Sequence, residues 1–319
     1  MIDLSLSSQQ REIVDGAVTL LRDQSPVSRL RRGSKPADVH GLLAEWGWFG
    51  VGLPEEMGGS NLGVAEEVVL YVEAGRFLLS PGVLATTLAA RLADADLRAA
   101  LLEGRQRAAM VMPAGEGAAY CFDRGNAQVL VTIAIDQISL FPAHAFKGEG
   151  VTGLDESVVL EKGSFDHNQR IALESSHRGV LLTVAMLVGI AKASCELAVE
   201  YAKVREQFGQ PIGAFQAVKH RCADMAVSAY AAEAQLLMAA ASALDDVENS
   251  PFQIAAAART AIAAARDNVA SAIQVHGGLG FTAECDAHLY LKRSHVLSRL
   301  VGGLQMQHAW LLACPAPGR

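Results

Sequence analysis

The sequence has few cysteines, and none of them occurs in a metal-binding pattern. Five cysteines are scattered over 319 residues, with no Cys-x-x-Cys pair and no ligand-like spacing to histidine. A zinc site or a disulfide framework is therefore not expected. Reduced thiols are typical of a cytoplasmic protein, and we expect that location.

The sequence also lacks an excess of positive charge and a segment suited to a membrane. The net charge is -7, whereas nucleic acid or an anionic membrane as main partner would favour a basic face. The first residues have neither a basic start nor an apolar core, so no secretory signal is expected. The longest apolar run, residues 179–191, is too short for a membrane span. We therefore expect neither nucleic acid nor a membrane as partner, although a local cationic pocket remains compatible.

What the sequence does have is enough apolar residues for a large core and a helix, strand, helix order. Hydrophobic residues make up 51% of the chain. Helical spacing dominates residues 1–107, β-branched and aromatic residues between turn signals dominate 108–170, and helical spacing returns over 171–319. We predict a mainly α fold with a small β insert: an N-terminal helical domain, a short β domain and a C-terminal four-helix bundle.

Cap and turn residues place the individual helices. Ser7 or Ser8 can cap a first helix through Leu21, and Pro36 or Asp38 can open a second that ends at Trp46. The remaining predicted helices are Glu66 to Phe77, Pro81 to Leu101, Val180 to Val204, Phe215 to Leu244, Phe252 to Val275 and Ala283 to Leu312.

One turn between two long predicted helices carries chemistry. It begins with R-E-Q-F-G-Q-P-I-G, where glycine and proline stop one helix and allow the next to start. A plain helical hairpin accounts for the glycines and the proline. It leaves Arg205 and Gln207 unused, and a guanidinium beside an amide is suited to bind a diphosphate.

A second stretch, Q-V-H-G-G-L-G-F-T-A-E, follows a predicted helix. Its two adjacent glycines let the backbone approach another group closely, and Gln274 lies one turn earlier. A double glycine taken alone is more often a helix terminator.

Together these two stretches resemble the acyl-CoA dehydrogenase family. The N-terminal W-G-W-F-G-V-G-L-P-E-E-M-G-G and the following E-E-V-V-L-Y-V-E-A-G-R resemble it too, so the resemblance covers nearly the whole chain. It implies FAD as cofactor, oxidation of an acyl-CoA to the trans-2-enoyl-CoA, and electron transfer to an electron-transfer flavoprotein. It also implies that six residues hold the adenine and diphosphate of FAD across a subunit interface. These are Arg205, Gln207, Phe208, Gln274, Gly277 and Gly278.

The sequence departs from the family at the catalytic base. The family places a carboxylate either 27 residues after the glutamine of Q-x-x-G-G or 26 residues before the turn arginine. Counted from Gln274 and Arg205, these positions are Val301 and Gly179, which cannot accept a proton. No catalytic residue is therefore predicted. Two nearby carboxylates, Glu284 and Asp286, and two histidines, His295 and His308, are weaker candidates.

The β segment of residues 108–170 is also about half the length usual in the family, and it lacks the family's flavin-contacting segment. We therefore expect the smaller subunit of a hetero-oligomeric acyl-CoA dehydrogenase. In this interpretation a larger sister subunit supplies the base, as in α2β2 heterotetramers that act on steroid side-chain CoA thioesters. Two alternatives remain: a homo-oligomeric enzyme with a relocated base, and a non-enzymatic scaffold of the same fold.

Overall fold

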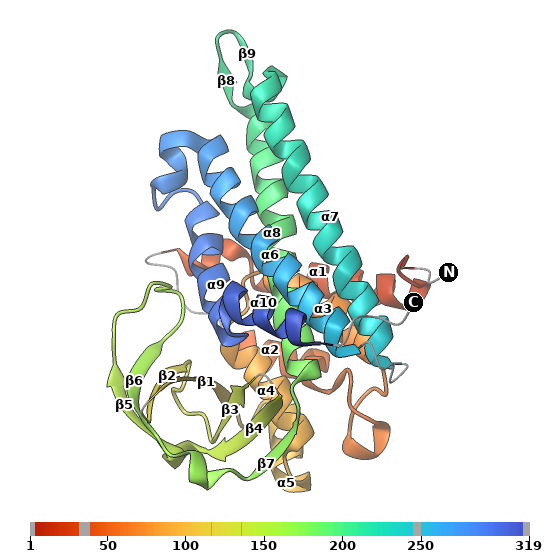
Figure 1. Ribbon diagram of the computed structural model, residues 1–319, viewed down its shortest axis with the longest axis vertical. Helices are drawn as coiled ribbons and strands as arrows, with labels where there is room; N and C mark the ends of the chain where they lie inside the picture. Colours follow the sequence, from red (N-terminus) through yellow and green to blue (C-terminus); the bar gives the residue numbers. More distant parts are fainter. Residues whose placement is uncertain (1–3, 32–38, 116, 135, 245–249, 315–319) are drawn as a thin grey trace.

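Helices open the chain and pack beside the later bundle (Figure 1). The computed structural model describes residues 4–31, 39–115, 117–134, 136–244 and 250–314. The helices that precede the sheet are α1 (Ser8–Gln24), α2 (Val39–Trp46), α3 (Val64–Arg76), α4 (Pro81–Leu92) and α5 (Ala95–Leu102). The glycine-rich loop between α2 and α3 forms two single 3-10 turns, η2 (Trp48–Gly50) and η3 (Glu55–Met57).

Capping residues explain where these helices begin. The predicted cap at Ser7 is confirmed, because its hydroxyl accepts from the Gln10 amide at 3.1 Å and its own amide donates to Gln10 Oε1 at 3.0 Å. The prediction of one helix from Pro81 to Leu101 is wrong. Asp94 starts a new helix there, and its carboxylate accepts from the Leu97 amide at 2.9 Å. The predicted start of the second helix, Pro36 or Asp38, lies outside the described residues.

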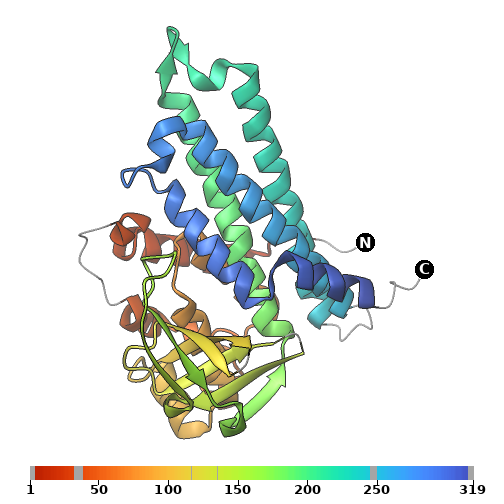
Figure 2. The ribbon, with the colours of Figure 1, turned by 60° about the vertical axis from the view of Figure 1, so that its left-hand side comes forward.

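A curved seven-stranded sheet follows the first helices (Figure 2). Its strand order is β5-β6-β2-β1-β3-β4-β7, and β1 and β3 form the parallel pair. The strands are β1 (Ala108–Gly115), β2 (Ala118–Phe122), β3 (Val129–Ile133), β4 (Gln137–Pro142), β5 (Phe146–Gly150), β6 (Leu160–Phe165) and β7 (Ala172–Ser175). Strand β7 extends the sheet beyond the predicted boundary at residue 170.

Alternation along β1 gives the sheet two buried faces. Ala108 and Met110 belong to the main core, which the helices share, whereas Ala109 and Val111 face a second cluster enclosed by the curved sheet. The aromatic ring of Phe146 is fully buried in that second cluster. The sheet is therefore fixed to the helices by one face and stabilised internally by the other.

The C-terminal half is a bundle of antiparallel helices (Figures 1 and 2). Its helices are α6 (His177–Val204), α7 (Gln216–Leu244), α8 (Ser250–His276), α9 (Ala287–Leu300) and α10 (Gly303–Ala313). The predicted single helix from Ala283 to Leu312 is wrong, because Gly302 and Gly303 adopt φ of 81° and 72° and interrupt it. The predicted fold class, mainly α with a small β insert, is confirmed.

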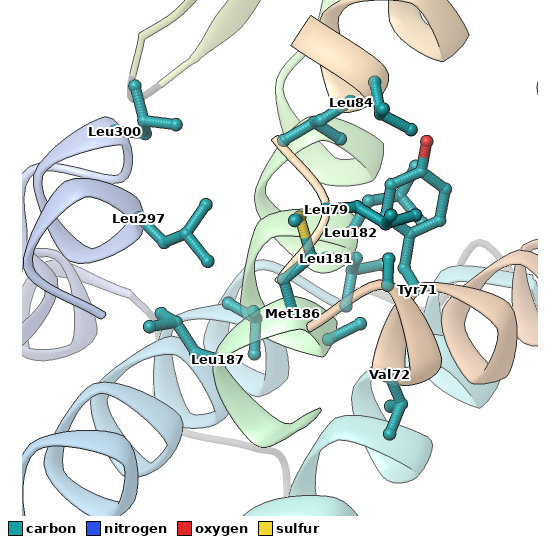
Figure 3. Close-up of a cluster of buried hydrophobic side chains, with 14 of the residues drawn as sticks. Tyr71, Val72, Leu79, Leu84, Leu181, Leu182, Met186, Leu187, Leu297 and Leu300 are labelled. Carbon is teal, nitrogen blue, oxygen red and sulfur yellow. The ribbon is translucent and has the colours of Figure 1, made fainter. Parts of the chain in front are cut away.

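Helix α6 is the central element of the core. Contrary to the expectation that its apolar run is too short, it is long and apolar enough to cross a membrane by length and composition. Within the protein, however, 83% of its apolar window is buried. Its side chains meet those of α3, α4 and α9 in the cluster of Figure 3. Burial on all sides explains the apolar composition, as in core helices of globular proteins.

The crossing of α3 and α6 depends on glycine. A Cβ at Gly75 would overlap the Met186 carbonyl oxygen, and one at Gly189 would overlap the Val72 carbonyl oxygen. The two backbones are therefore in contact. The helices before and after the sheet share this core, and the predicted division at residues 107 and 170 stays a prediction.

Candidate functional site

A short β hairpin projects beyond the bundle between α6 and α7 (Figure 1). Arg205 ends α6, and its amide donates to the Tyr201 carbonyl at 2.9 Å. Strands β8 (Glu206–Gln207) and β9 (Gln210–Pro211) then pair around a two-residue turn. Phe208 and Gly209 have φ of 53° and 78°, as a type I′ hairpin turn requires. The predicted turn is thus a more ordered structure than a simple helix connection.

The side chains of this hairpin are directed outward and are little used by the fold. Phe208 is 93% exposed, and its one ring contact in the described part of the chain is with Phe215, edge-on with centroids 6.2 Å apart. Arg205 is exposed, and its guanidinium has no hydrogen-bond or ion-pair partner among the described residues. Gln207 donates from its amide to the Glu206 carbonyl at 2.7 Å, which leaves its own amide oxygen exposed. These groups are available to a ligand or to another subunit.

The second predicted stretch lies at the same end of the bundle (Figures 1 and 2). Helix α8 ends at His276, and the chain continues into the 3-10 turn η7 (Gly277–Phe281). Gly277 has φ of 61°, and a Cβ at Gly277 or Gly278 would meet no other atom within 4 Å. Gln274 is exposed one turn before them. Open space over this backbone would let a ligand reach its amides.

A pair of stacked rings joins the two stretches. Tyr201, one turn before Arg205, lies 4.2 Å from His276 between ring centroids, with an interplanar angle of 22°. His276 is buried, and its Nδ1 is 2.7 Å from the Ala272 carbonyl oxygen. The sequence analysis missed this pair, although His276 stands inside the quoted motif Q-V-H-G-G. The stack fixes the end of α8 against the end of α6.

The six predicted cofactor residues fit the adenine and diphosphate part of FAD chemically. An unpaired guanidinium and accessible backbone amides suit a diphosphate, and an exposed phenyl ring suits an adenosine. The group around Arg205 and the group around Gln274 are connected by the stacked rings of Tyr201 and His276. Their role in holding FAD stays a prediction.

The two family positions for the base lie in a different environment. Gly179 is buried in the first turn of α6, and a Cβ there would lie 2.7 Å from Ile138 Cγ2. Val301 is 4% exposed and belongs to the main core, directly after Leu300 at the end of α9. No carboxylate stands at either place, and the core around Gly179 leaves no space for one.

The weaker candidates do not replace the missing base. Asp286 is held by Arg31 through two hydrogen bonds of 2.7 and 3.1 Å. It starts α9, whereas Val301 ends it, and 15 residues of helix correspond to about 22 Å. Glu284, His295 and His308 are exposed, as expected for solvated side chains.

Distance separates the predicted cofactor residues from the base positions. Arg205 and Gly179 lie at opposite ends of α6, and 26 residues of helix correspond to about 39 Å. FAD is much shorter than this. A flavin whose diphosphate lies at Arg205 therefore has its ring well away from Gly179 of the same chain.

Comparison with known proteins identifies the family. The pattern described as "Acyl-CoA dehydrogenase, C-terminal domain" matches residues 170–311, and that of the "Acyl-CoA dehydrogenase, N-terminal domain" matches residues 7–102. The acyl-CoA dehydrogenase IpdE2 of Mycobacterium tuberculosis is 32% identical over 78% of this chain and 77% of its own length. This chain belongs to the acyl-CoA dehydrogenase family.

A second acyl-CoA dehydrogenase of M. tuberculosis, FadE34, is 35% identical over 82% of this chain but only 40% of its own length. The chain thus spans less than half of that relative. Among solved structures, the ChsE4-ChsE5 complex of M. tuberculosis gives a TM-score of 0.79 at 21% identity, over 99% of this chain and 100% of the other. A structure described as PigA with FAD and proline gives 0.82 at 18% identity, over 98% of each chain. At these identities the two likenesses show a shared fold alone.

Proposed function

We propose that this chain is the base-less subunit of a hetero-oligomeric, FAD-dependent acyl-CoA dehydrogenase. One observation carries the proposal: both family positions for the base are apolar and buried, while the six cofactor residues at the other end of α6 are exposed. Removal of the α-proton of a thioester needs a positioned base. A larger sister subunit, with this chain in a heterotetramer, supplies it.

Each subunit has a separate task in this proposal. Arg205 and the amides near Gly277 neutralise and orient the diphosphate of an FAD whose ring lies in the sister subunit. Phe208 packs against the adenosine. The chemistry that bound FAD supplies is acceptance of the β-hydrogen as hydride. The electrons then pass to an electron-transfer flavoprotein, and the five free thiols suit a cytoplasmic location.

The comparisons support an assembly of two different chains. ChsE4-ChsE5 is described as a complex. This chain matches only 40% of the length of FadE34, which agrees with an enzyme made of two dehydrogenase-like units that perform different tasks. Steroid side-chain CoA thioesters are the acyl-CoA substrates we propose, by resemblance to such assemblies.

Two other functions fit less well. A homo-oligomeric enzyme needs a relocated base, but Asp286 is engaged by Arg31 and starts the helix that Val301 ends. In a scaffold that binds no flavin, the guanidinium of Arg205, unpaired among the described residues, and the exposed ring of Phe208 would have no function. The homo-oligomeric alternative would still use the exposed hairpin to bind FAD, whereas the scaffold would not.

The test is to purify the chain alone and together with a dehydrogenase-like chain that retains a glutamate at either base position. The complex should be yellow and should oxidise an acyl-CoA with an artificial electron acceptor. The chain alone should hold little flavin and show no turnover. Stoichiometric FAD with turnover in the isolated chain would disprove the proposal, and a complex that binds no flavin would favour the scaffold.

A further inference from the structure

A cavity of about 820 Å³ lies between the first helices, the sheet and α9. Its walls include the α3–α4 loop, the start of β1, the loop before β6 and one side of α9. Its rim includes Phe281 of η7, the turn that also carries Gly277 and Gly278. Neither Val301 nor Gly179 lines it. Its volume is within the range of about 300–1,000 Å³ that is typical of sites for small organic molecules.

One wall of the cavity is built around a buried ion pair. Arg293 Nε donates to Asp155 Oδ2 at 2.7 Å, and both side chains are 1% exposed. The same guanidinium donates to the Leu78 and Leu79 carbonyls at 2.7 and 2.5 Å and to Ser157 Oγ at 2.8 Å. Four of the five N–H donors of this arginine are therefore used by the protein. Arg293 holds α9, the α3–α4 loop and the loop before β6 together.

A second guanidinium beside it has no carboxylate. Arg29 Nη1 donates to the Ser25 and Pro26 carbonyls at 2.7 and 3.1 Å, and Nη2 donates to the Leu78 carbonyl at 3.3 Å. Three of its five N–H donors are thus used, all on neutral oxygens, and two have no partner among the described residues. Burial and the neighbouring Arg293 lower the pKa of Arg29 to about 10. Its positive charge therefore has no carboxylate partner among the residues that the structure describes.

A lysine adds to this positive wall. Lys292 precedes Arg293 on α9, lines the cavity and has no ion-pair partner among the described residues. Across the cavity stands Asp123, whose Oδ2 is buried without a hydrogen-bond partner in the described part of the chain. Burial raises the pKa of this carboxyl against the opposing effect of Arg293. Glu156 lines the cavity as a second carboxylate, and Arg31 and Arg107 line it as further cations. Five cationic side chains thus face two carboxylates, in a chain whose net charge is -7.

Apolar side chains line much of the cavity, interspersed with polar ones such as Ser80 and His288. Leu79, Val83, Leu289 and Val159 stand among its walls. Apolar walls favour a ligand with an apolar body, because its burial contributes about 25 cal/mol per Å² removed from water. Arg29 and Lys292 lie on the side formed by α9 and the end of η1 (Val27–Leu30), and Arg107 lies directly before β1. Arg29 and Lys292 therefore give one side of the cavity a cationic character, with apolar side chains close by.

We propose that this cavity binds a compact apolar molecule that carries one carboxylate, with the carboxylate against Arg29 and Lys292. The two unused N–H donors of Arg29 suit the two oxygens of a carboxylate. None of the six predicted cofactor residues lines the cavity, although Phe281 of the same turn η7 does. This site therefore does not depend on the proposed subunit role.

The test uses adamantane-1-carboxylate and its neutral analogue adamantane-1-carboxamide as probes of the full chain by isothermal titration calorimetry. The carboxylate should bind about tenfold more tightly than the carboxamide, a difference of about 1.4 kcal/mol. Lys292→Gln should remove most of that preference and leave carboxamide binding unchanged. Lys147→Gln, on the exposed strand β5 and outside the cavity, is the matched control and should bind like the unaltered chain.

A third variant separates charge from space. Ala283→Trp at the exposed rim keeps every cationic group and should weaken both probes. Equal affinity for the two probes, absence of binding, or displacement of the carboxylate by an equal concentration of inorganic phosphate would overturn the proposal. Equal losses in Lys292→Gln and Lys147→Gln would overturn it as well. None of these readouts depends on flavin or turnover, so failure here leaves the proposed function untouched.

Discussion

The two ends of α6 differ in almost every physical respect. At the end near the sheet, Gly179 is enclosed by Ile138, Ile133 and Leu88, and the surrounding core is apolar. At the other end, Arg205 and Phe208 project into solvent from a hairpin of two-residue strands. The first end stabilises the fold. The second contributes little to it, because an unpaired surface charge and an exposed ring gain almost nothing on folding.

This difference bears on function. Residues that stabilise a fold need no further explanation, whereas an ordered, outward hairpin with a bulky exposed aromatic residue suits contact with another molecule. The exposed end of α6 therefore indicates a binding site for a ligand or a partner, whereas the buried end has no space for a catalytic base. In a self-sufficient dehydrogenase both ends would carry chemistry.

The largest expected effect comes from placing a carboxylate at the buried end. Gly179→Glu would drive Cβ into Ile138 and bury a charge without a partner, so we expect a loss of at least about 4 kcal/mol in the free energy of unfolding. Chemical denaturation followed by circular dichroism measures it. Gly278→Ala, at a position where a Cβ meets nothing, is the control and should change stability by less than about 0.5 kcal/mol. A stable Gly179→Glu variant would mean that this end can still accommodate a base.

A smaller loss of stability is expected when the buried ion pair between Asp155 and Arg293 is broken. Asp155→Asn leaves Arg293 buried without its counter-charge and should cost about 3 kcal/mol at neutral pH. Burial acts to raise the pKa of Asp155, but Arg293 and Ser157 outweigh it and hold that pKa below its usual range. The stabilisation is therefore present above the unfolded pKa of about 3.9 and is lost as the pH falls through the lower folded value.

The measurement is the stability difference between the unaltered chain and Asp155→Asn as a function of pH. This stability difference should become smaller below about pH 4, because protonation of Asp155 then removes the same negative charge from the unaltered chain. Asp23→Asn, at an exposed position, serves as control. A difference that stays constant down to pH 2 would mean that Asp155 acts through packing rather than through charge.

Much of the fold was predictable because local signals agree with the final packing. The Ser7 cap, the stop at Gly209 and Pro211, and the β-branched texture after Ala108 each correspond to a feature of the structure. The errors fall where one residue overrides a continuous helical pattern. Asp94 restarts a helix, and Gly302 breaks another, at places where the apolar spacing continues through.

The candidate site was predictable only where its residues are neighbours in sequence. The motifs around Arg205 and Gln274 were visible, but their connection through Tyr201 and His276 was not, because these two residues are 75 positions apart in the sequence. The cavity was invisible for the same reason. Arg293 and Asp155 are separated by 138 residues and have no shared motif.

The smallest expected effect belongs to the exposed end, and it should appear in cofactor binding rather than in folding. Arg205→Ala removes a guanidinium that has no partner in the described chain, so the free energy of unfolding should change by less than about 0.5 kcal/mol. In the complex with the sister subunit, loss of a charge-assisted contact to the diphosphate should weaken FAD retention about tenfold or more, which corresponds to about 1.4 kcal/mol. Flavin fluorescence during dialysis measures this loss. Lys203→Ala, two residues earlier and paired with Glu200, removes an equal charge from the same helix end and should leave FAD retention unchanged. Equal flavin loss in both variants would mean that Arg205 acts only through its overall charge and not through a direct contact. No flavin loss in either variant would mean that the cofactor binds elsewhere.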